Sequence, residues 1–330
     1  MSDGGILLAD IGGTNARFAL ADPAAPMPLL GDDAATYPVD EFPSLADAAR
    51  HYLDGTGARP RAAVLAVAGR VDGDHARLTN HPWVVSSARV RDALSLDAVL
   101  LVNDFLAQSA AVPLLGESHL VAIGAPSRVA SDGAARTYAI LGPGTGLGVG
   151  GLLYRDGRHY PLATEGGHAS FAPGTPEEIE VLQRLSAHYG RVSNERLVSG
   201  GGLVNIHRAL SEMAGLDPGP RQPEDITAGA ASGDRRCMRA IDIFCAVFGA
   251  IAGDVVLTLG AWDGVYLSGG LVPVLLPTLQ HSGFRQRFEG KGRYAPAMAT
   301  VPTLAVLHPQ PGLLGAAAIA AEAFRARGPG

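Results

Sequence analysis

The feature that most constrains the fold is the sequence DIGGTN at positions 10–15. It follows an apolar run over 6–9 and precedes an alternating run over 16–20. A Gly-Gly turn can point successive backbone N–H groups into one concavity, and the missing side chains let anionic oxygens come close. The segment therefore predicts a phosphate site at the end of a buried strand, with Asp10 facing the accompanying metal. An ordinary hairpin turn with a solvated acid fits the turn chemistry equally well.

Two more glycine clusters follow predicted strands. GPGTGLG occupies 142–148 after the apolar run 138–141, and SGG occupies 268–270 after 264–267. The second leads into a plausible helix start, where backbone N–H groups suit a nucleotide phosphate. One such turn is expected by chance in a chain with 43 glycines. Three of them at the ends of predicted strands favour a site for a phosphate chain.

The cluster at 142–148 also matches a dinucleotide fingerprint, because Gly146, Gly148 and Gly151 satisfy G-x-G-x-x-G. A pyrophosphate site of that kind requires a helix after the glycines, whereas 152–158 has the pattern of a strand and a turn. An NAD-linked oxidoreductase remains an alternative that this context disfavours.

A carboxylate emerges at the end of another predicted strand. The apolar run 98–102 leads into Asn103 and Asp104, at the edge where open α/β sheets bind ligands. For phosphoryl transfer to an alcohol, a carboxylate within hydrogen-bond reach of the attacking hydroxyl accepts its proton. Asp104 is our candidate for this general base. The competing interpretation is that Asn103 or Asp104 is a helix N-cap.

A second polar cluster comprises Glu165 and His168, separated by two glycines. Glu accepts hydroxyl hydrogen bonds and His donates or accepts them, so the pair suits a polyol. A metal site is disfavoured because no third ligand lies at a sensible spacing. Glu195 could join the cluster, although by itself it is more typical of a surface acid or of an acid that caps a helix.

Apolar runs alternate with helical patterns, which predicts an α/β fold. The predicted strands are 6–11, 16–21, 62–68, 98–102, 138–141, 147–153 and 264–267, and the predicted helices are 44–53, 105–111, 176–189, 201–213, 237–259 and 312–324. The segments 215–223 and 283–296 are rich in Gly, Pro and charge, and we interpret them as surface connections.

Composition excludes several classes of function. The chain has 330 residues, of which 47% are hydrophobic and 18% charged, so two lobes are expected. A net charge of −6 argues against nucleic acid and anionic membranes as partners. No uninterrupted apolar run reaches the ~18 residues of a membrane span, and no signal peptide is evident, so a cytoplasmic location is expected.

The cysteines and the lysine exclude further classes of function. The two cysteines, Cys237 and Cys245, lie in a helical pattern and suit reduced core thiols. The only lysine is Lys291, which is followed by glycine and arginine. Neither a Walker A loop nor a protein kinase places its lysine in such a context.

The chain resembles the bacterial ATP-dependent glucokinases over nearly its whole length. The motifs that carry the resemblance lie in the family order at 10–17, 101–105, 142–148, 165–168 with 171–173, 197–200, 267–270 and 311–315. The resemblance implies the two-domain, actin-like (ribonuclease H-like) fold of hexokinases, with a cleft between a smaller and a larger α/β domain. The smaller domain would comprise 1–114 and 308–330, and the larger 115–307.

The resemblance also implies an activity, which is transfer of the ATP γ-phosphate to the 6-hydroxyl of D-glucose with Mg²⁺, in a homodimer. By position, the catalytic base is Asp104. The sugar ligands are Asn103, Asp104, Glu165, His168 and Glu195. The nucleotide contacts are Ala9, Asp10, Ile11, Gly12, Gly13, Thr14, Asn15, Gly144, Thr145, Gly146, Gly269 and Gly270, and Asp10 would contact Mg²⁺ through water.

The chain departs from related sequences in two respects. The segment 66–70 lacks the proline that many members carry after this strand, and the chain has too few cysteines for the zinc motif of the repressor/open-reading-frame/kinase group. The second departure indicates the zinc-free glucokinase branch. A kinase for another hexose, such as mannose or fructose, and a non-catalytic sugar-sensing protein of the same fold remain alternatives.

Overall fold

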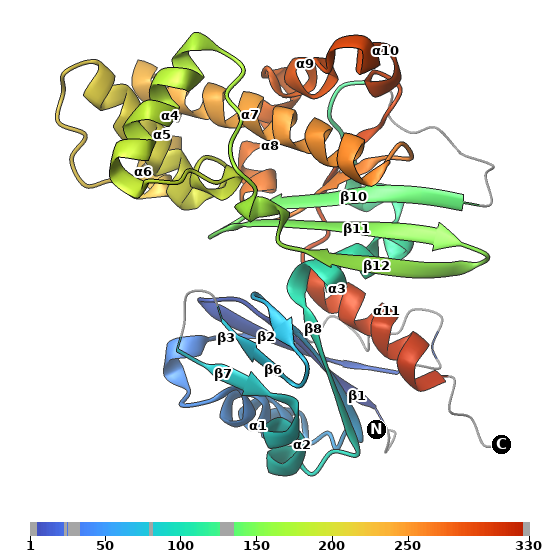
Figure 1. Cartoon of the computed structure of the whole chain (residues 1–330). Coiled ribbons are helices and arrows are strands. Elements are labelled where there is room, and N and C mark those ends of the chain that lie inside the picture. Colours follow the sequence, from blue (N-terminus) through green and yellow to red (C-terminus); the bar gives the residue numbers. More distant parts are fainter. Residues whose placement is uncertain (1–4, 23–24, 26–33, 79–81, 126–134, 326–330) are drawn as a thin grey trace. The chain divides into compact units, whose positions relative to one another are not determined.

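The computed structural model describes residues 5–22, 25, 34–78, 82–125 and 135–325. They belong to two compact units, and Figure 1 labels many of their helices and strands. The first unit comprises residues 1–116, 159–163 and 308–330, and the second comprises residues 117–158 and 164–307. Both units contain helices and mixed β-sheets, in agreement with the predicted α/β class.

The first unit contains a five-stranded sheet. In sheet order its strands are β3 (Ala35–Pro38), β2 (Asn15–Ala21), β1 (Ile6–Ile11), β4 (Ala62–Val67) and β8 (Ala98–Asn103). β1, β4 and β8 run parallel, whereas β2 is antiparallel to β1 and β3. A smaller antiparallel sheet consists of β5 (Val71–Asp72), β6 (His75–Arg77) and β7 (Val84–Ser86).

Helices bury both faces of the five-stranded sheet. The helices of this unit are α1 (Leu45–Thr56), α2 (Ser87–Leu94), α3 (Asp104–Ala111) and α11 (Pro311–Arg325), with 3₁₀ turns at η1 (Val39–Glu41) and η2 (Val112–Leu114). Leu7 of β1 packs in one apolar cluster with residues of α1 and α2, and Leu8 packs in another with residues of α3 and α11. Successive strand residues face opposite sides, so a strand covered on both faces requires the continuous apolar run seen here.

The second unit is built on a six-stranded sheet, of which residues 159–163 in the outermost strand are grouped with the first unit. In sheet order its strands are β12 (Arg158–Thr164), β11 (Leu147–Arg155), β10 (Ala135–Pro143), β13 (Val265–Leu267), β14 (Thr303–Val306) and β9 (Leu120–Ala122). β10 and β11 form an antiparallel hairpin, β10, β13 and β14 run parallel, and β9 is antiparallel to β14. The strand expected after the glycine cluster at 142–148 is therefore confirmed as β11.

Most helices of the second unit pack around one long central helix. They are α4 (Pro176–Tyr189), α5 (Gly200–Met213), α6 (Pro223–Ala231), α7 (Arg235–Leu259), α8 (Leu271–His281), α9 (Phe284–Glu289) and α10 (Ala295–Met298). The 3₁₀ turns are η3 (Glu117–His119), η4 (Gly166–His168), η5 (Asn194–Arg196) and η6 (Gly292–Tyr294).

The central helix, α7, is the one helix of the described residues that is long and apolar enough to cross a membrane. Its most apolar window of 18 residues is 72% buried within the protein, as expected for a core helix. Cys237 and Cys245 lie on α7 as buried free thiols, which confirms the prediction of reduced core cysteines. Burial raises the pKa of Cys245 to about 12, so this thiol is held in its neutral form.

The prediction of a loop over 283–296 is wrong for most of this segment, which contains α9, η6 and the start of α10. Residues 284–289 form α9, and the side chains of Phe284 and Phe288 are completely buried. Phe284 packs edge-on against Phe248 of α7, with ring centroids 5.4 Å apart. The local composition of this segment favours a loop, but burial of two aromatic side chains against α7 stabilises a helix.

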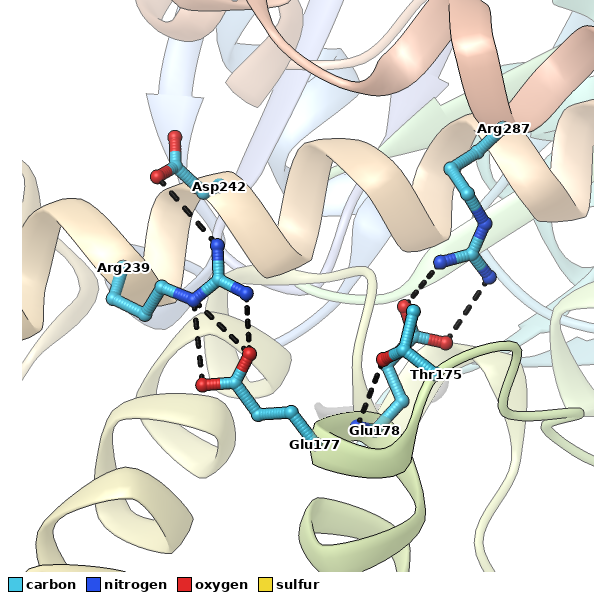
Figure 2. Close-up of polar contacts among 6 residues, drawn as sticks. All are labelled: Thr175, Glu177, Glu178, Arg239, Asp242 and Arg287. Atoms are coloured by element: carbon cyan, nitrogen blue, oxygen red, sulfur yellow. Dashed lines mark hydrogen bonds and ion pairs between the residues drawn. The ribbon is translucent and has the colours of Figure 1, made fainter.

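Ion pairs join α4 to α7 and α9, as Figure 2 shows. Glu178 forms a bidentate pair with Arg287 of α9 and accepts a 2.7 Å hydrogen bond from the backbone N–H of Gly174. Glu177 forms a bidentate pair with Arg239 of α7. Glu178, Arg239 and Arg287 line a pocket of about 380 Å³. All three of these charged groups already have a partner within the chain.

Candidate active site

In the first unit, three parallel strands end at the same level. Ile11 of β1 lies beside Val67 of β4, which lies beside Asn103 of β8. The residues that follow each strand therefore emerge at one edge of the sheet, and this is the edge at which open α/β sheets bind ligands. Two of the predicted site segments, 9–15 and 103–104, meet there.

The first glycine turn joins β1 to β2. It is closed by a 2.9 Å hydrogen bond from the N–H of Gly12 to the carbonyl of Asn15. The hairpin alternative is thus correct for the backbone but wrong for the solvated acid, because the side chain of Asp10 is mostly buried. The phosphate contacts of residues 12–14 stay a prediction. Thr14, at the tip, is exposed to solvent.

Asp10 lies behind this turn, with only 18% of its side chain exposed. Its Oδ2 is 3.5 Å from Nη1 of Arg17, the residue opposite it on β2. The first turn of α11 also abuts Asp10, because a Cβ on Gly312 would lie 2.6 Å from the Asp10 Cγ. Burial raises the pKa of the Asp10 carboxyl, whereas the charge of Arg17 and its hydrogen bond act in the opposite direction. The helix N-terminus also favours the negative charge.

Asn103 and Asp104 lie at the start of α3. The Oδ1 of Asn103 accepts hydrogen bonds from the N–H groups of Phe105 at 2.9 Å and Leu106 at 3.1 Å, and its Nδ2 donates to the carbonyl of Gly69 at 3.1 Å. The N-cap interpretation is therefore confirmed for Asn103. Asp104 is the first residue of the helix, where the helix dipole stabilises a carboxylate.

In the second unit, the two remaining glycine clusters meet at one sheet edge. Leu141 of β10 pairs with Leu267 of β13, and the N–H of Ser268 donates to the carbonyl of Leu141 at 2.7 Å. Gly269 has a φ of +92°. A Cβ there would lie 2.7 Å from the carbonyl oxygen of Pro143. Glycine is thus required by both the backbone angle and the close approach of the two turns.

Two helices begin at these turns. α8 starts directly after Gly270, and α5 starts at Gly200, whose N–H donates to the carbonyl of Gly144 at 2.8 Å. The hydroxyl of Ser199 caps α5 by accepting a 2.9 Å hydrogen bond from Gly202. Helix N-termini carry unpaired N–H groups and a positive dipole end, so the arrangement suits an anionic phosphate chain.

The Glu165–His168 segment is a tight turn packed on the start of β11. The N–H of His168 donates to the carbonyl of Glu165 at 3.0 Å. Thr164 holds the turn on the sheet, because its Oγ1 donates to the carbonyl of Val149 at 2.8 Å and accepts from the N–H of Gly166 at 3.2 Å. Glu165 and His168 are both exposed, as a ligand-binding pair requires.

Glu195 lies in η5, next to that turn. The N–H of Asn194 donates to the carbonyl of Ala169 at 2.8 Å, so η5 is fastened to the chain that follows η4. The carboxylate of Glu195 reaches the glycine turn, where Oε2 accepts a 3.0 Å hydrogen bond from the N–H of Leu147. The structure thus gathers the predicted residues of this unit, namely 144–146, 165–168, 195 and 269–270, around the ends of β10 and β13.

The glucokinase family model matches residues 7–323. The chain belongs to the glucokinase family. A relative named glucokinase, from Stenotrophomonas maltophilia strain K279a, is 62% identical over 97% of this chain and 96% of its own length. The match confirms the resemblance described above.

Solved structures give the same result for the fold. A glucokinase from an Antarctic psychrotroph superimposes with a TM-score of 0.83 at 33% identity, covering 97% of this chain and 99% of that one. A glucokinase from Balamuthia mandrillaris, solved in complex with glucose, superimposes with a TM-score of 0.79 at 22% identity, covering 97% of this chain and 94% of that one. These likenesses confirm the actin-like fold of the glucokinase family.

Several residues that support these candidate segments were not predicted. Arg17 and Gly312 lie in the motifs 10–17 and 311–315, but neither motif indicates their role. The fold shows that both residues lie against Asp10. Arg191, whose guanidinium donates to the carbonyl of His168, lies outside every motif used. Thr164 had a detectable signal, since a hydroxyl residue directly before a tight turn commonly bonds to the backbone.

Proposed function

We propose that this chain catalyses transfer of the γ-phosphate of ATP to the 6-hydroxyl of D-glucose, giving glucose 6-phosphate and ADP. The observation that carries the proposal is the meeting of two glycine turns with the N-termini of α5 and α8 at one sheet edge, which suits a phosphate chain. Membership of the glucokinase family supports glucose as the sugar.

In the proposed reaction, Asp104 is the general base. Its carboxylate accepts the proton of the 6-hydroxyl while the oxygen attacks the γ-phosphorus, and the bond from that phosphorus to the β–γ bridging oxygen breaks as ADP leaves. Asn103, Glu165, His168 and Glu195 are proposed to bind sugar hydroxyls. Asn103 already uses its Oδ1 and one N–H within the chain, so its second amide N–H is the group available to the sugar.

The nucleotide contacts are proposed for residues 9–15 in the first unit and for 144–146 and 269–270 in the second. Mg²⁺ is proposed beside Asp10. In the described part of the chain, no group of three or more His, Cys, Asp or Glu side chains could hold a metal ion. One carboxylate nevertheless fits, because Mg²⁺ at phosphoryl-transfer sites is commonly held by one or two carboxylates, phosphate oxygens and water. When bound, the ion would neutralise phosphate charge.

Four broader features belong to the same proposal. They are a homodimer, a cytoplasmic location, a role in glycolysis, and a division into a smaller domain of 1–114 with 308–330 and a larger domain of 115–307. The two compact units support the division, although the first unit also includes residues 159–163. Sedimentation velocity of the purified protein tests the homodimer.

The experiment that tests the function is ADP formation with Mg-ATP across glucose, mannose, fructose, glucosamine and N-acetylated hexosamines, together with detection of the 6-phosphate. A strong preference for glucose supports the proposal. Epimers should be discriminated strongly, because a misplaced hydroxyl leaves buried polar groups unpaired. Preference for another hexose would indicate that kinase instead, and no turnover with any sugar by folded protein would indicate a sugar-sensing role.

A further inference from the structure

The carboxylate of Glu195 has a contact that sugar binding does not explain. Its Oε2 accepts the 3.0 Å hydrogen bond from the N–H of Leu147, the residue that ends the glycine turn 144–146 and begins β11. The same oxygen lies so close to Gly146 that a Cβ there would overlap it. The carboxylate therefore rests directly on the turn.

The turn is the loop of the β10–β11 hairpin, so its flanking residues Pro143 and Leu147 are already paired. Within it, the N–H of Gly144 donates to the carbonyl of Gly146 at 2.8 Å. From outside, the N–H of Gly200 donates to the carbonyl of Gly144 at 2.8 Å. Glu195 supplies a side-chain contact at the opposite end of the turn, and its own backbone is fixed because its carbonyl accepts a 2.8 Å hydrogen bond from the Ser199 hydroxyl. The segment 195–200 thus holds the turn at both ends.

A carboxylate at this position is costly for a turn that is to bind phosphate. Like charges repel, so a negative side chain beside the turn weakens binding of a phosphate. A second effect of the same side chain must therefore favour phosphate binding. A charge-assisted hydrogen bond to a backbone N–H is stronger than a neutral one, and it can keep a glycine-rich turn in one conformation. Holding the turn in its binding conformation is an effect that can offset the charge repulsion.

We propose that Glu195 is a positioning residue for the nucleotide, in addition to its proposed contact with the sugar. Its Oε2 holds turn 144–146 in the conformation that binds phosphate, and it does so before any sugar is present. The inference rests on the proposed function, since it takes this turn as a nucleotide contact. A sugar hydroxyl on the other oxygen, Oε1, would immobilise the same side chain, so sugar and nucleotide would each favour binding of the other.

The test is nucleotide affinity in the absence of sugar, measured by calorimetry with Mg²⁺ and the non-hydrolysable analogue AMPPNP. Glu195→Ala removes the hydrogen bond, and we expect about tenfold weaker binding. Glu195→Gln keeps an acceptor for the N–H of Leu147 and removes the charge, so it should bind AMPPNP at least as tightly as the parent chain. Both variants should bind glucose more weakly.

Two further variants isolate the cause. Glu195→Asp keeps the charge but is one methylene too short to reach Leu147, so it should behave like the alanine variant, and it replaces that variant if Glu195→Ala does not fold. Glu180→Ala is the matched control, because it removes an exposed carboxylate of α4, in the same unit but outside the proposed site. It should leave AMPPNP affinity unchanged.

Unchanged or tighter AMPPNP binding by folded Glu195→Ala would overturn the inference and leave the proposed function standing. Equal losses in Glu195→Gln and Glu195→Ala would also overturn it, because the hydrogen bond would then not be the cause. Failure of the parent chain to bind AMPPNP at all would instead refute the proposed function, and the inference with it.

Discussion

Asp104 occupies the first position of α3, directly after the residue that caps the helix. Changing it to Asn preserves the size of the side chain and the cap but removes the proton acceptor. We expect turnover to fall by about 10²- to 10⁴-fold with little change in glucose affinity, because a general base acts mainly in the transition state. The comparison is kcat against the glucose dissociation constant, with Asp92→Asn on the exposed face of α2 as control. Turnover within a few-fold of the parent chain would refute the assignment.

At the same scale, Asp10 links stability to pH. Its pKa is raised by burial above the ordinary 3.8, so the folded chain binds this proton more tightly than the unfolded chain. The contribution of Asp10 to the free energy of unfolding therefore falls as pH rises from about 3.8 through the folded pKa. Asp10→Asn removes this titration.

The melting temperature of Asp10→Asn minus that of the parent chain should therefore rise with pH across that window and then stay constant. Thermal unfolding between about pH 4 and 8, without Mg²⁺ or nucleotide, measures the difference. A difference that falls with pH would show that Arg17 and the start of α11 lower the pKa of Asp10 by more than burial raises it.

At the scale of elements, α4 offers two adjacent acids in different environments (Figure 2). Glu178 and its partner Arg287 are 3% and 21% exposed, whereas Glu177 and its partner Arg239 are 30% and 52% exposed. Glu178→Gln leaves a largely buried guanidinium without its counter-charge, which should lower the free energy of unfolding by about 3 kcal/mol. Glu177→Gln should cost at most about 1 kcal/mol.

The two variants make the same chemical change at neighbouring positions, so each serves as control for the other. Denaturation by urea, followed by circular dichroism, measures both. Equal losses would show that burial does not determine the contribution of these pairs. A large loss only in Glu178→Gln would establish that its pair with Arg287 fastens α4 to α9.

At the scale of the whole molecule, glucose should stabilise the chain by mass action. A ligand that binds only the folded state adds about 2.7 kcal/mol at a concentration 100 times its dissociation constant, which is a rise of a few degrees in melting temperature for a chain of this size. Thermal shift with glucose measures it. Mannitol at the same concentration controls for general stabilisation by polyols. Equal shifts with both compounds would contradict specific sugar binding.

Much of the fold was accessible from the sequence because its signals are local. The strands at 6–11 and 147–153 and the helices at 176–189 and 237–259 are marked by apolar runs, glycine turns and caps, and each is found in the structure. Short strands such as β9, at the edge of its sheet, and β14, beside it, were missed. Three or four residues carry no periodicity, and their pairing with distant strands is what makes them strands.

The sequence by itself determined the family, the α/β class, the three glycine turns and the acids beside them. Each of these is encoded by short motifs or by local patterns of apolar residues. The tertiary structure alone decided which of them meet. The contacts of Glu195 with Leu147 and of Gly312 with Asp10 join residues 48 and 302 positions apart. No local pattern encodes such a contact, because it depends on the register of the strands and the packing of helices that place both residues at one edge.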